Sequence, residues 1–137
     1  MNKIFICSPL KGKMEENMAK ARNYSRTVAL EGNLPITPHI YFTQFLDENV
    51  AEERALGIKM GIELMKECDR MYVYGEKFSK GMLEEIDWWR LHKRREDIYY
   101  HKEDYTWGDF KREAESMGYE PEQESQLEVK FNPSKEK

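Results

Sequence analysis

The strongest candidate for chemistry in this sequence is Glu85, which follows a loop bounded by two glycines, 75–81, GEKFSKG. The loop leads into a helical pattern with an apolar stripe of Met82, Ile86 and Trp89. Glu85 lies on the flank of this stripe, whereas Glu84 points almost the opposite way, toward solvent. We expect the positive end of the helix macrodipole to keep Glu85 ionised. Such a carboxylate suits nucleophilic attack on an electrophilic sugar carbon; a glutamate that only complements the helix dipole is the alternative.

A second group of candidates lies in the loop 8–13, Ser-Pro-Leu-Lys-Gly-Lys, immediately before a predicted helix. Its hydroxyl, its two ammonium groups and the backbone N–H groups at the helix start would together hold a phosphate. The loop lacks the GxxxxGK[ST] pattern of a P-loop. An ordinary strand-to-helix turn with exposed lysines is the alternative.

A histidine and several aromatic residues follow the second predicted strand. His39 is expected at the end of that strand, where it would face the same ligand as the two loops or serve as a packed, hydrogen-bonded residue. Tyr41, Phe42 and Phe45 offer planar rings that stack on a nucleobase, and packing in the core or at a subunit interface explains them equally well.

Composition excludes several classes of protein. The net charge is −4, which argues against general affinity for nucleic acids, and no window of the sequence is apolar enough for a bilayer span. Cys7 and Cys68 form no CxxC pair and the three histidines are widely spaced, so we expect buried packing thiols, no metal site and no cofactor. The N-terminus resembles no signal peptide, and we expect a cytoplasmic protein.

The 137 residues suffice for one domain and a tail. Residues 103–137 carry 5 basic and 10 acidic groups, and from Glu120 onward few are apolar, so we expect an α/β domain over 1–102 and a C-terminal helix with a mobile acidic tail over 103–137. The aromatic residues exceed what one small core hides, which favours a homo-oligomer; they are Trp88, Trp89, Tyr99, Tyr100, Tyr105 and Trp107. A solvated face is expected for Arg90, Lys93, Arg94 and Arg95.

Periodicity predicts alternating strands and helices. Strands are expected at Lys3–Cys7, over 71–74 and over 97–101. Pro35 and Pro38 interrupt the segment 34–40, which can form only a short strand that runs into a loop through Phe45. Helices are expected over 14–31, 50–67, 81–95 and 107–117. This alternation implies an α/β sandwich with a small parallel sheet. Ligands of such sheets bind beyond the carboxyl ends of the strands, which here are 8–13, 39–45 and 75–81.

These loops resemble those of a known group. The opening Ile-Phe-Ile-Cys-Ser-Pro-Leu-x-Gly, the centre Pro38-His39-Ile40-Tyr41-Phe42 and the element Ser79-x-Gly81-Met82-x-x-Glu85-Ile86 are similar to the nucleoside 2-deoxyribosyltransferase-like superfamily. They look most like a domain-of-unknown-function branch common in phages and prophages. The 2'-deoxynucleoside 5'-monophosphate N-glycosidases of that superfamily have a similar loop after their first strand and the same serine, glycine and glutamate spacing.

The resemblance implies a Rossmann-like three-layer fold, Glu85 as the nucleophile at C1', phosphate contacts from Ser8 and Ser79, and an oligomer whose neighbours complete each site. The candidate binding residues for substrate and phosphate are Ser8, Leu10, Lys11, Gly12, His39, Tyr41, Gly75, Ser79, Gly81 and Met82. The sequence departs from the family at Gly75 and Gly61, where relatives carry acids, so the acid partner of Glu85 is unassigned. A glycine at 75 would also enlarge the pocket.

The leading functional hypothesis is cleavage of the N-glycosidic bond of a nucleoside 5'-monophosphate, by hydrolysis or by transfer to a second base. The alternatives are a non-catalytic nucleotide-binding protein, such as a phage protein that sequesters a nucleotide or an NAD-derived signal, and an NAD glycohydrolase. The expected partners are a small-molecule nucleotide and further copies of the chain.

Overall fold

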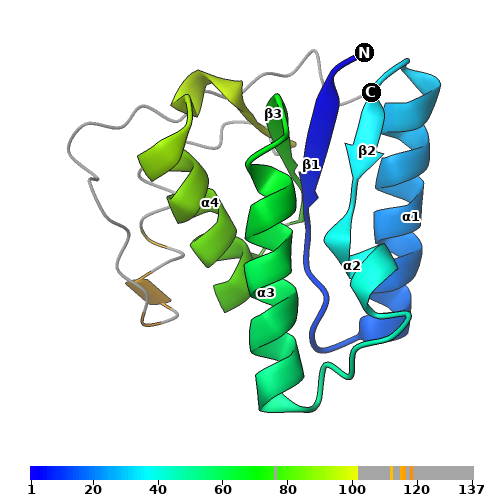
Figure 1. Cartoon of the computed structure of the whole chain (residues 1–137), viewed down its shortest axis with the longest axis vertical. Coiled ribbons are helices and arrows are strands. Elements are labelled where there is room, and N and C mark those ends of the chain that lie inside the picture. Colours follow the sequence, from blue (N-terminus) through cyan, green and yellow to red (C-terminus); the bar gives the residue numbers. More distant parts are fainter. Residues whose placement is uncertain (76, 102–111, 113–114, 117, 119–137) are drawn as a thin grey trace. The chain divides into compact units, whose positions relative to one another are not determined.

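The described chain alternates strands with helices, as the sequence predicts. The computed structural model describes residues 1–75, 77–101, 112, 115, 116 and 118. The elements are β1 (Lys3–Cys7), α1 (Met14–Leu30), β2 (Leu34–Ile36), α2 (Pro38–Phe42), α3 (Ala51–Met65), β3 (Arg70–Val73), α4 (Lys80–His92), a 3-10 helix (Arg95–Asp97) and β4 (Ile98–Tyr100) (Figure 1).

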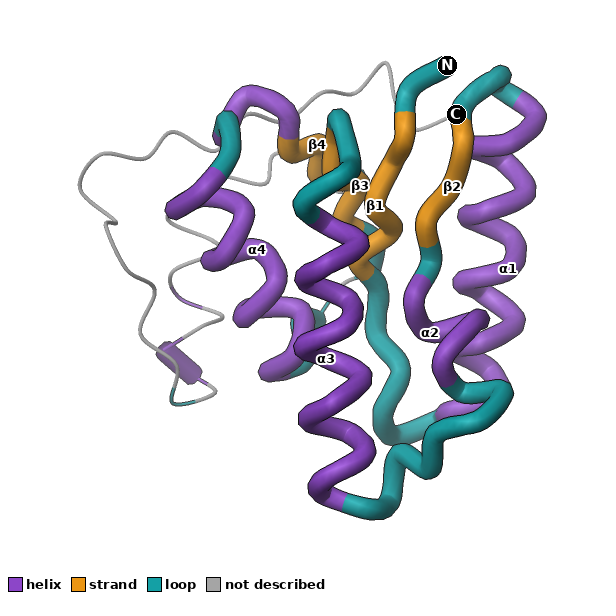
Figure 2. Tube along the Cα trace, viewed as in Figure 1, coloured by secondary structure: helices purple, strands orange, loops and turns teal. Residues whose placement is uncertain are grey.

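The four strands form one sheet in the order β2-β1-β3-β4. β1 and β2 are parallel, with Phe5 opposite Ile36, and β3 and β4 are parallel, with Tyr72 opposite Tyr99 (Figure 2). The strands are short and largely apolar because parallel strands in such folds are covered on both faces. This sheet confirms the predicted Rossmann-like α/β fold.

The chain divides into two compact units, and the first comprises Met1–Ile6 and Leu10–Asp69. Its core contains Ile4, Phe5 and Ile6 of β1, Ala21 and Val28 of α1, and Met65 of α3. Ala21 and Val28 are the buried residues of α1, which occurs where a helix is predicted over 14–31 and runs alongside β2 (Figure 1). The helix ends before Gly32, whose φ of +92° suits glycine.

The segment 34–45 contains the predicted short strand, but the loop expected after it is wrong in part. β2 ends at Ile36, and Pro38 begins the helix α2 instead. Proline suits the first position of a helix because its fixed φ is helical and the missing N–H has no intrahelical partner there. His39 therefore lies in α2 and does not end a strand.

The second unit comprises Cys7–Pro9 and residues from Arg70 onward. The Cys7 carbonyl accepts a hydrogen bond from the Tyr74 N–H at 2.9 Å, which continues the ladder between β1 and β3. Met71, Tyr72 and Val73 of β3 are buried, as are seven residues of α4, namely Met82, Leu83, Glu85, Ile86, Asp87, Trp89 and Arg90. The α4 pattern expected over 81–95 begins one residue earlier and ends at His92.

Two predictions about exposed side chains near α4 are wrong in part. The predicted solvated basic face does not include Arg90, which is buried with its guanidinium 3.9 Å from Asp87, because it lies on the inward side of the helix. Among the aromatic residues assigned to a subunit contact, Trp89 and Tyr100 are buried within this unit. Tyr105, Trp107, most of the helix predicted over 107–117 and the predicted tail lie outside the described residues.

None of the helices in the described part of the chain combines the length and the apolar character that crossing a bilayer demands.

Candidate active site

The helix that carries Glu85 begins at a serine cap. Ser79 precedes α4 with extended backbone, and its Oγ accepts a hydrogen bond from the Met82 N–H at 3.2 Å. A serine at this position satisfies one of the backbone donors that a helix start leaves without an intrahelical acceptor. The N–H groups of Lys80 and Gly81 head the same helix, so this end of α4 has the polarity that attracts an anion.

Glu85 lies inside α4 and not in its first turn. It is the sixth residue of the helix, and its side chain is only 8% exposed. Burial raises the pKa of Glu85 to about 8; the Cys7 thiol lowers it in part, and the charge of Glu84 raises it further. The expectation that the helix dipole keeps this carboxyl ionised is therefore wrong, because the dipole acts mainly within the first turn while desolvation acts on the whole buried group.

The Cys7 thiol and the Glu85 carboxyl form a buried pair. Burial, followed by the charge of Glu85, raises the pKa of Cys7 well above its ordinary value, and the thiol as a hydrogen-bond donor lowers the pKa of Glu85 in part. The Sγ atom of Cys7 also lies 3.8 Å from the carbonyl oxygen of Met82, in the first turn of α4. Cys7 is fully buried, as the sequence predicts for a packing residue, but its contact with Glu85 is a role that sequence reasoning missed.

Gly75 follows β3 with a φ of +109°, a conformation that side chains disfavour. A Cβ atom there would lie 3.2 Å from both Cδ and Cγ of Pro9. The direction of that Cβ atom contradicts the idea that Gly75 enlarges a pocket, because the space beside it is filled by Pro9. Backbone conformation and the contact with Pro9 together oppose any side chain at this position, an acidic one included.

Several predicted site residues share the second unit with Glu85: Ser8, Gly75, Ser79, Gly81 and Met82. Ser8 is 1% exposed and Met82 is buried, whereas Ser79 and Gly81 are half-buried at the start of α4. The serine and glycine spacing before Glu85 thus corresponds to the cap and the first turn of one helix.

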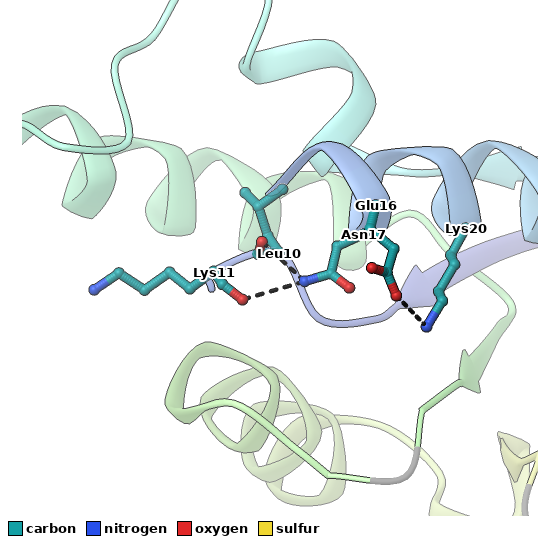
Figure 3. A network of polar contacts seen from close by, with 5 residues as sticks. All are labelled: Leu10, Lys11, Glu16, Asn17 and Lys20. Atoms are coloured by element: carbon teal, nitrogen blue, oxygen red, sulfur yellow. Dashed lines mark hydrogen bonds and ion pairs between the residues drawn. The ribbon is translucent and has the colours of Figure 1, made fainter. Parts of the chain in front are cut away.

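The predicted residues Leu10, Lys11 and Gly12 belong to the first unit. The side-chain amide of Asn17 donates hydrogen bonds to the carbonyl oxygens of Leu10 and Lys11, both at 3.1 Å (Figure 3). Gly12 turns the chain with a φ of +97°, and the Lys11 side chain is exposed. Asn17 was also missed; an asparagine one turn into a helix is the only sequence signal for this clamp.

His39 and Tyr41 lie on α2, also in the first unit. His39 is half-buried and Tyr41 is 62% exposed. The rings of Tyr41, Phe42 and Phe45 contact one another with centroids 5.3 to 6.0 Å apart. Tyr41 also borders an open hollow of about 520 Å³ with Pro35, Ile36, Ile40 and Leu64, so an apolar surface surrounds it.

Among the described residues, no three or more His, Cys, Asp and Glu side chains are grouped to hold a metal ion.

Comparison with known proteins assigns the family. The chain belongs to the family described as domain of unknown function DUF7768, whose profile matches residues 2–99. Its structure is similar to a solved 2-deoxyribosyltransferase from the psychrotolerant bacterium Bacillus psychrosaccharolyticus, with a TM-score of 0.59, 14% sequence identity and 81% of each chain covered. The likeness shows a shared fold. No curated protein matches the sequence.

Proposed function

We propose that this protein is an enzyme that breaks the N-glycosidic bond of a nucleoside 5'-monophosphate, with Glu85 as the nucleophile. The observation that carries the proposal is a carboxyl group with 8% exposure, held on the helix whose start is capped by Ser79. Its fold neighbour is a 2-deoxyribosyltransferase, which supports a 2-deoxyribosyl substrate.

The geometry of α4 supports a nucleotide substrate. At 1.5 Å per residue, Glu85 lies roughly 9 Å along the axis from Ser79, and helix side chains lean back toward the N-terminus. A phosphate at the N–H groups of Lys80 and Gly81 would thus leave room for a sugar before the carboxyl group is reached. The Ser79 hydroxyl accepts from Met82 and keeps its own proton to donate to a phosphate oxygen.

The reaction follows from this placement. An ionised Glu85 oxygen attacks C1' as the bond from C1' to the base nitrogen breaks, and the electron pair leaves with the base, which takes a proton from water. The product is a glycosyl ester of Glu85. Water then attacks C1' and releases the sugar phosphate, or a second base attacks and forms a new nucleotide. The partly apolar surroundings favour attack, because a poorly solvated carboxylate is a stronger nucleophile.

The candidate binding residues of the first unit are predicted independently of Glu85. Lys11 and Gly12 remain predicted phosphate contacts, and His39 and Tyr41 remain predicted contacts to the sugar or the base. The proposal for Glu85 depends on none of them. A homo-oligomer and a cytoplasmic location likewise remain predictions.

The decisive experiment measures free base released from a panel of deoxynucleoside and ribonucleoside monophosphates, the matching nucleosides and NAD, at pH 9. Glu85→Gln should lower release at least about 100-fold. Glu84→Gln, a change of the same chemistry one residue away, should keep release close to wild type. A slow 2'-fluoro nucleotide should add the mass of the sugar phosphate to the peptide that contains Glu85. Equal release by the wild type and Glu85→Gln would overturn the mechanism.

A nucleotide-binding protein without turnover is the second candidate. Two observations favour it: the pKa of about 8 leaves most Glu85 groups neutral at pH 7, and Gly75 offers no acid beside β3. Intact nucleotide recovered from a tight complex after long incubation at pH 9 would select it. Nicotinamide released from NAD, with no base released from monophosphates, would select an NAD glycohydrolase.

A further inference from the structure

We propose that Cys7 is a positioning residue for Glu85, because its single thiol proton moves between two acceptors according to the charge of the carboxyl group. This inference rests on the proposed function for its catalytic meaning, but its physical content concerns the free protein alone.

The two acceptors lie on one helix. Cys7 ends β1 with its side chain fully buried, and its Sγ lies 3.8 Å from the Met82 carbonyl oxygen. The buried carboxyl group of Glu85 belongs to the residue three positions further along the same side of α4, and the thiol lowers its pKa as a hydrogen-bond donor. A thiol carries one proton, so a full-strength hydrogen bond goes to one acceptor at a time.

The charge of Glu85 decides between them. A hydrogen bond to an ionised acceptor is roughly twice as strong as one between neutral groups. When Glu85 is neutral, the thiol has the Met82 carbonyl as an acceptor. When Glu85 is ionised, the carboxylate attracts the thiol proton and is held in a fixed rotamer. The thiol stays protonated throughout, because burial raises the pKa of Cys7.

This arrangement suits a nucleophile. A thiol is a weaker donor than a hydroxyl, so it orients the carboxylate while withdrawing little of its electron density. Formation of the glycosyl ester removes the charge from Glu85, and the thiol proton then returns to the Met82 carbonyl. The charged and titratable groups that act on Glu85 in the described part of the chain are Cys7 at the end of β1 and Glu84 on α4.

The test follows the ionisation of Glu85 by the carbon-13 shift of its carboxyl carbon, assigned with Glu85→Gln. Cys7→Ala should raise the pH midpoint of the Glu85 titration by roughly half to one pH unit, since the ionised carboxylate loses the thiol as its hydrogen-bond donor. If Cys7 only fills space, the smaller alanine admits water and the midpoint falls. An unchanged or lowered midpoint in Cys7→Ala overturns the proposal. Cys68→Ala, which removes the other buried thiol, should leave the midpoint unchanged.

A second measurement keeps the proposal testable if Cys7→Ala does not fold. Cys7→Ser retains a donor and should give a midpoint at or below the wild-type value; a raised midpoint overturns the proposal. In Cys68→Ala, the infrared S–H band of Cys7 should move to lower frequency as Glu85 ionises, and a band that does not move overturns it as well.

The catalytic consequence separates this inference from the proposed function. At pH 7, Cys7→Ala should release base 3- to 10-fold more slowly, in proportion to the smaller ionised fraction, and the loss should disappear near pH 10. If no substrate is cleaved by the wild type, the proposed function fails while the shift of the Glu85 midpoint still decides the role of Cys7.

Discussion

A Cβ atom built on Gly75 would lie 3.2 Å from the ring of Pro9, and the φ of Gly75 is +109°. The loop after β1 and the loop after β3 therefore approach each other so closely that even a methyl group on Gly75 would crowd Pro9. The resemblance described above implies an acidic residue at this position. The contact of Gly75 with Pro9 gives the physical reason for the glycine.

Gly75→Ala should destabilise the protein by about 2 kcal/mol, because the positive φ and the contact with Pro9 both oppose a methyl group. Gly12→Ala is a matched control: its φ is +97°, but nothing lies within 4 Å of the added Cβ, so about 1 kcal/mol is expected. Urea unfolding of both variants measures the difference. Equal losses would show that Pro9 exerts no steric pressure, and Pro9→Ala should recover part of the Gly75→Ala loss.

The stability of the protein should fall as the pH rises from 4.5 to about 8. The folded-state pKa of Glu85 lies above its ordinary value of 4.5, so the folded chain binds more protons than the unfolded chain in this window. The contribution of this group is therefore fully present below pH 4.5 and is lost as the pH passes 8, at up to roughly 1.4 kcal/mol per pH unit.

Denaturant unfolding at a series of pH values checks this expectation. Glu85→Gln removes the titrating group, so the difference between its stability and that of the wild type should vary across the window and level off above it. A difference that stays constant from pH 4.5 to 9 would mean that Glu85 is ionised in the folded protein at neutral pH.

The rate of base release should increase with pH through a midpoint near 8. A nucleophile must be ionised, and kcat/KM reports the ionisation of the free enzyme. Measurements from pH 6.5 upward avoid the second ionisation of the substrate phosphate, which lies near 6. A rate that declines above pH 8 would instead identify Glu85 as the proton donor to the leaving base.

Ser79 combines a structural and a binding role that two substitutions separate. Ser79→Ala should cost about 1 kcal/mol of stability through loss of the cap, and it should raise KM for a monophosphate more than for the matching nucleoside. Ser79→Asp keeps a capping oxygen but repels phosphate, so it should retain stability and still raise KM. Because Ser8 is 1% exposed, Ser8→Ala should change KM less. If KM for the monophosphate is unchanged in both Ser79 variants, the phosphate does not bind at the start of α4.

The predicted homo-oligomer has a testable contact face in the first unit. Tyr41 and Phe45 are 62% and 56% exposed, and they border open hollows of about 520 and 400 Å³. Sedimentation velocity should show an oligomer that Tyr41→Glu with Phe45→Glu dissociates, because charges in an apolar contact are poorly solvated. Glu63→Lys, an exposed charge change on α3, should leave the assembly intact.

Local sequence determined much of the fold. The apolar runs of β1 and β3 and the helical pattern of α1 depend on residues near one another in the chain, and each element begins and ends within one residue of its predicted bounds. The exception is Pro38, because a proline can end a strand and can also begin a helix. The pattern of apolar residues around it favours neither structure. In the folded chain Pro38 begins α2.

The candidate site required the tertiary structure. Sequence alone singled out Glu85 and its spacing from Ser79, because Ser79 caps the helix that carries Glu85 and the two are close in the chain. The ionisation of Glu85 depends on burial and on Cys7, 78 positions earlier in the chain, and the glycine at 75 depends on Pro9. Desolvation and steric contact arise from atoms brought together by the sheet, and no local pattern in the sequence encodes which atoms those are.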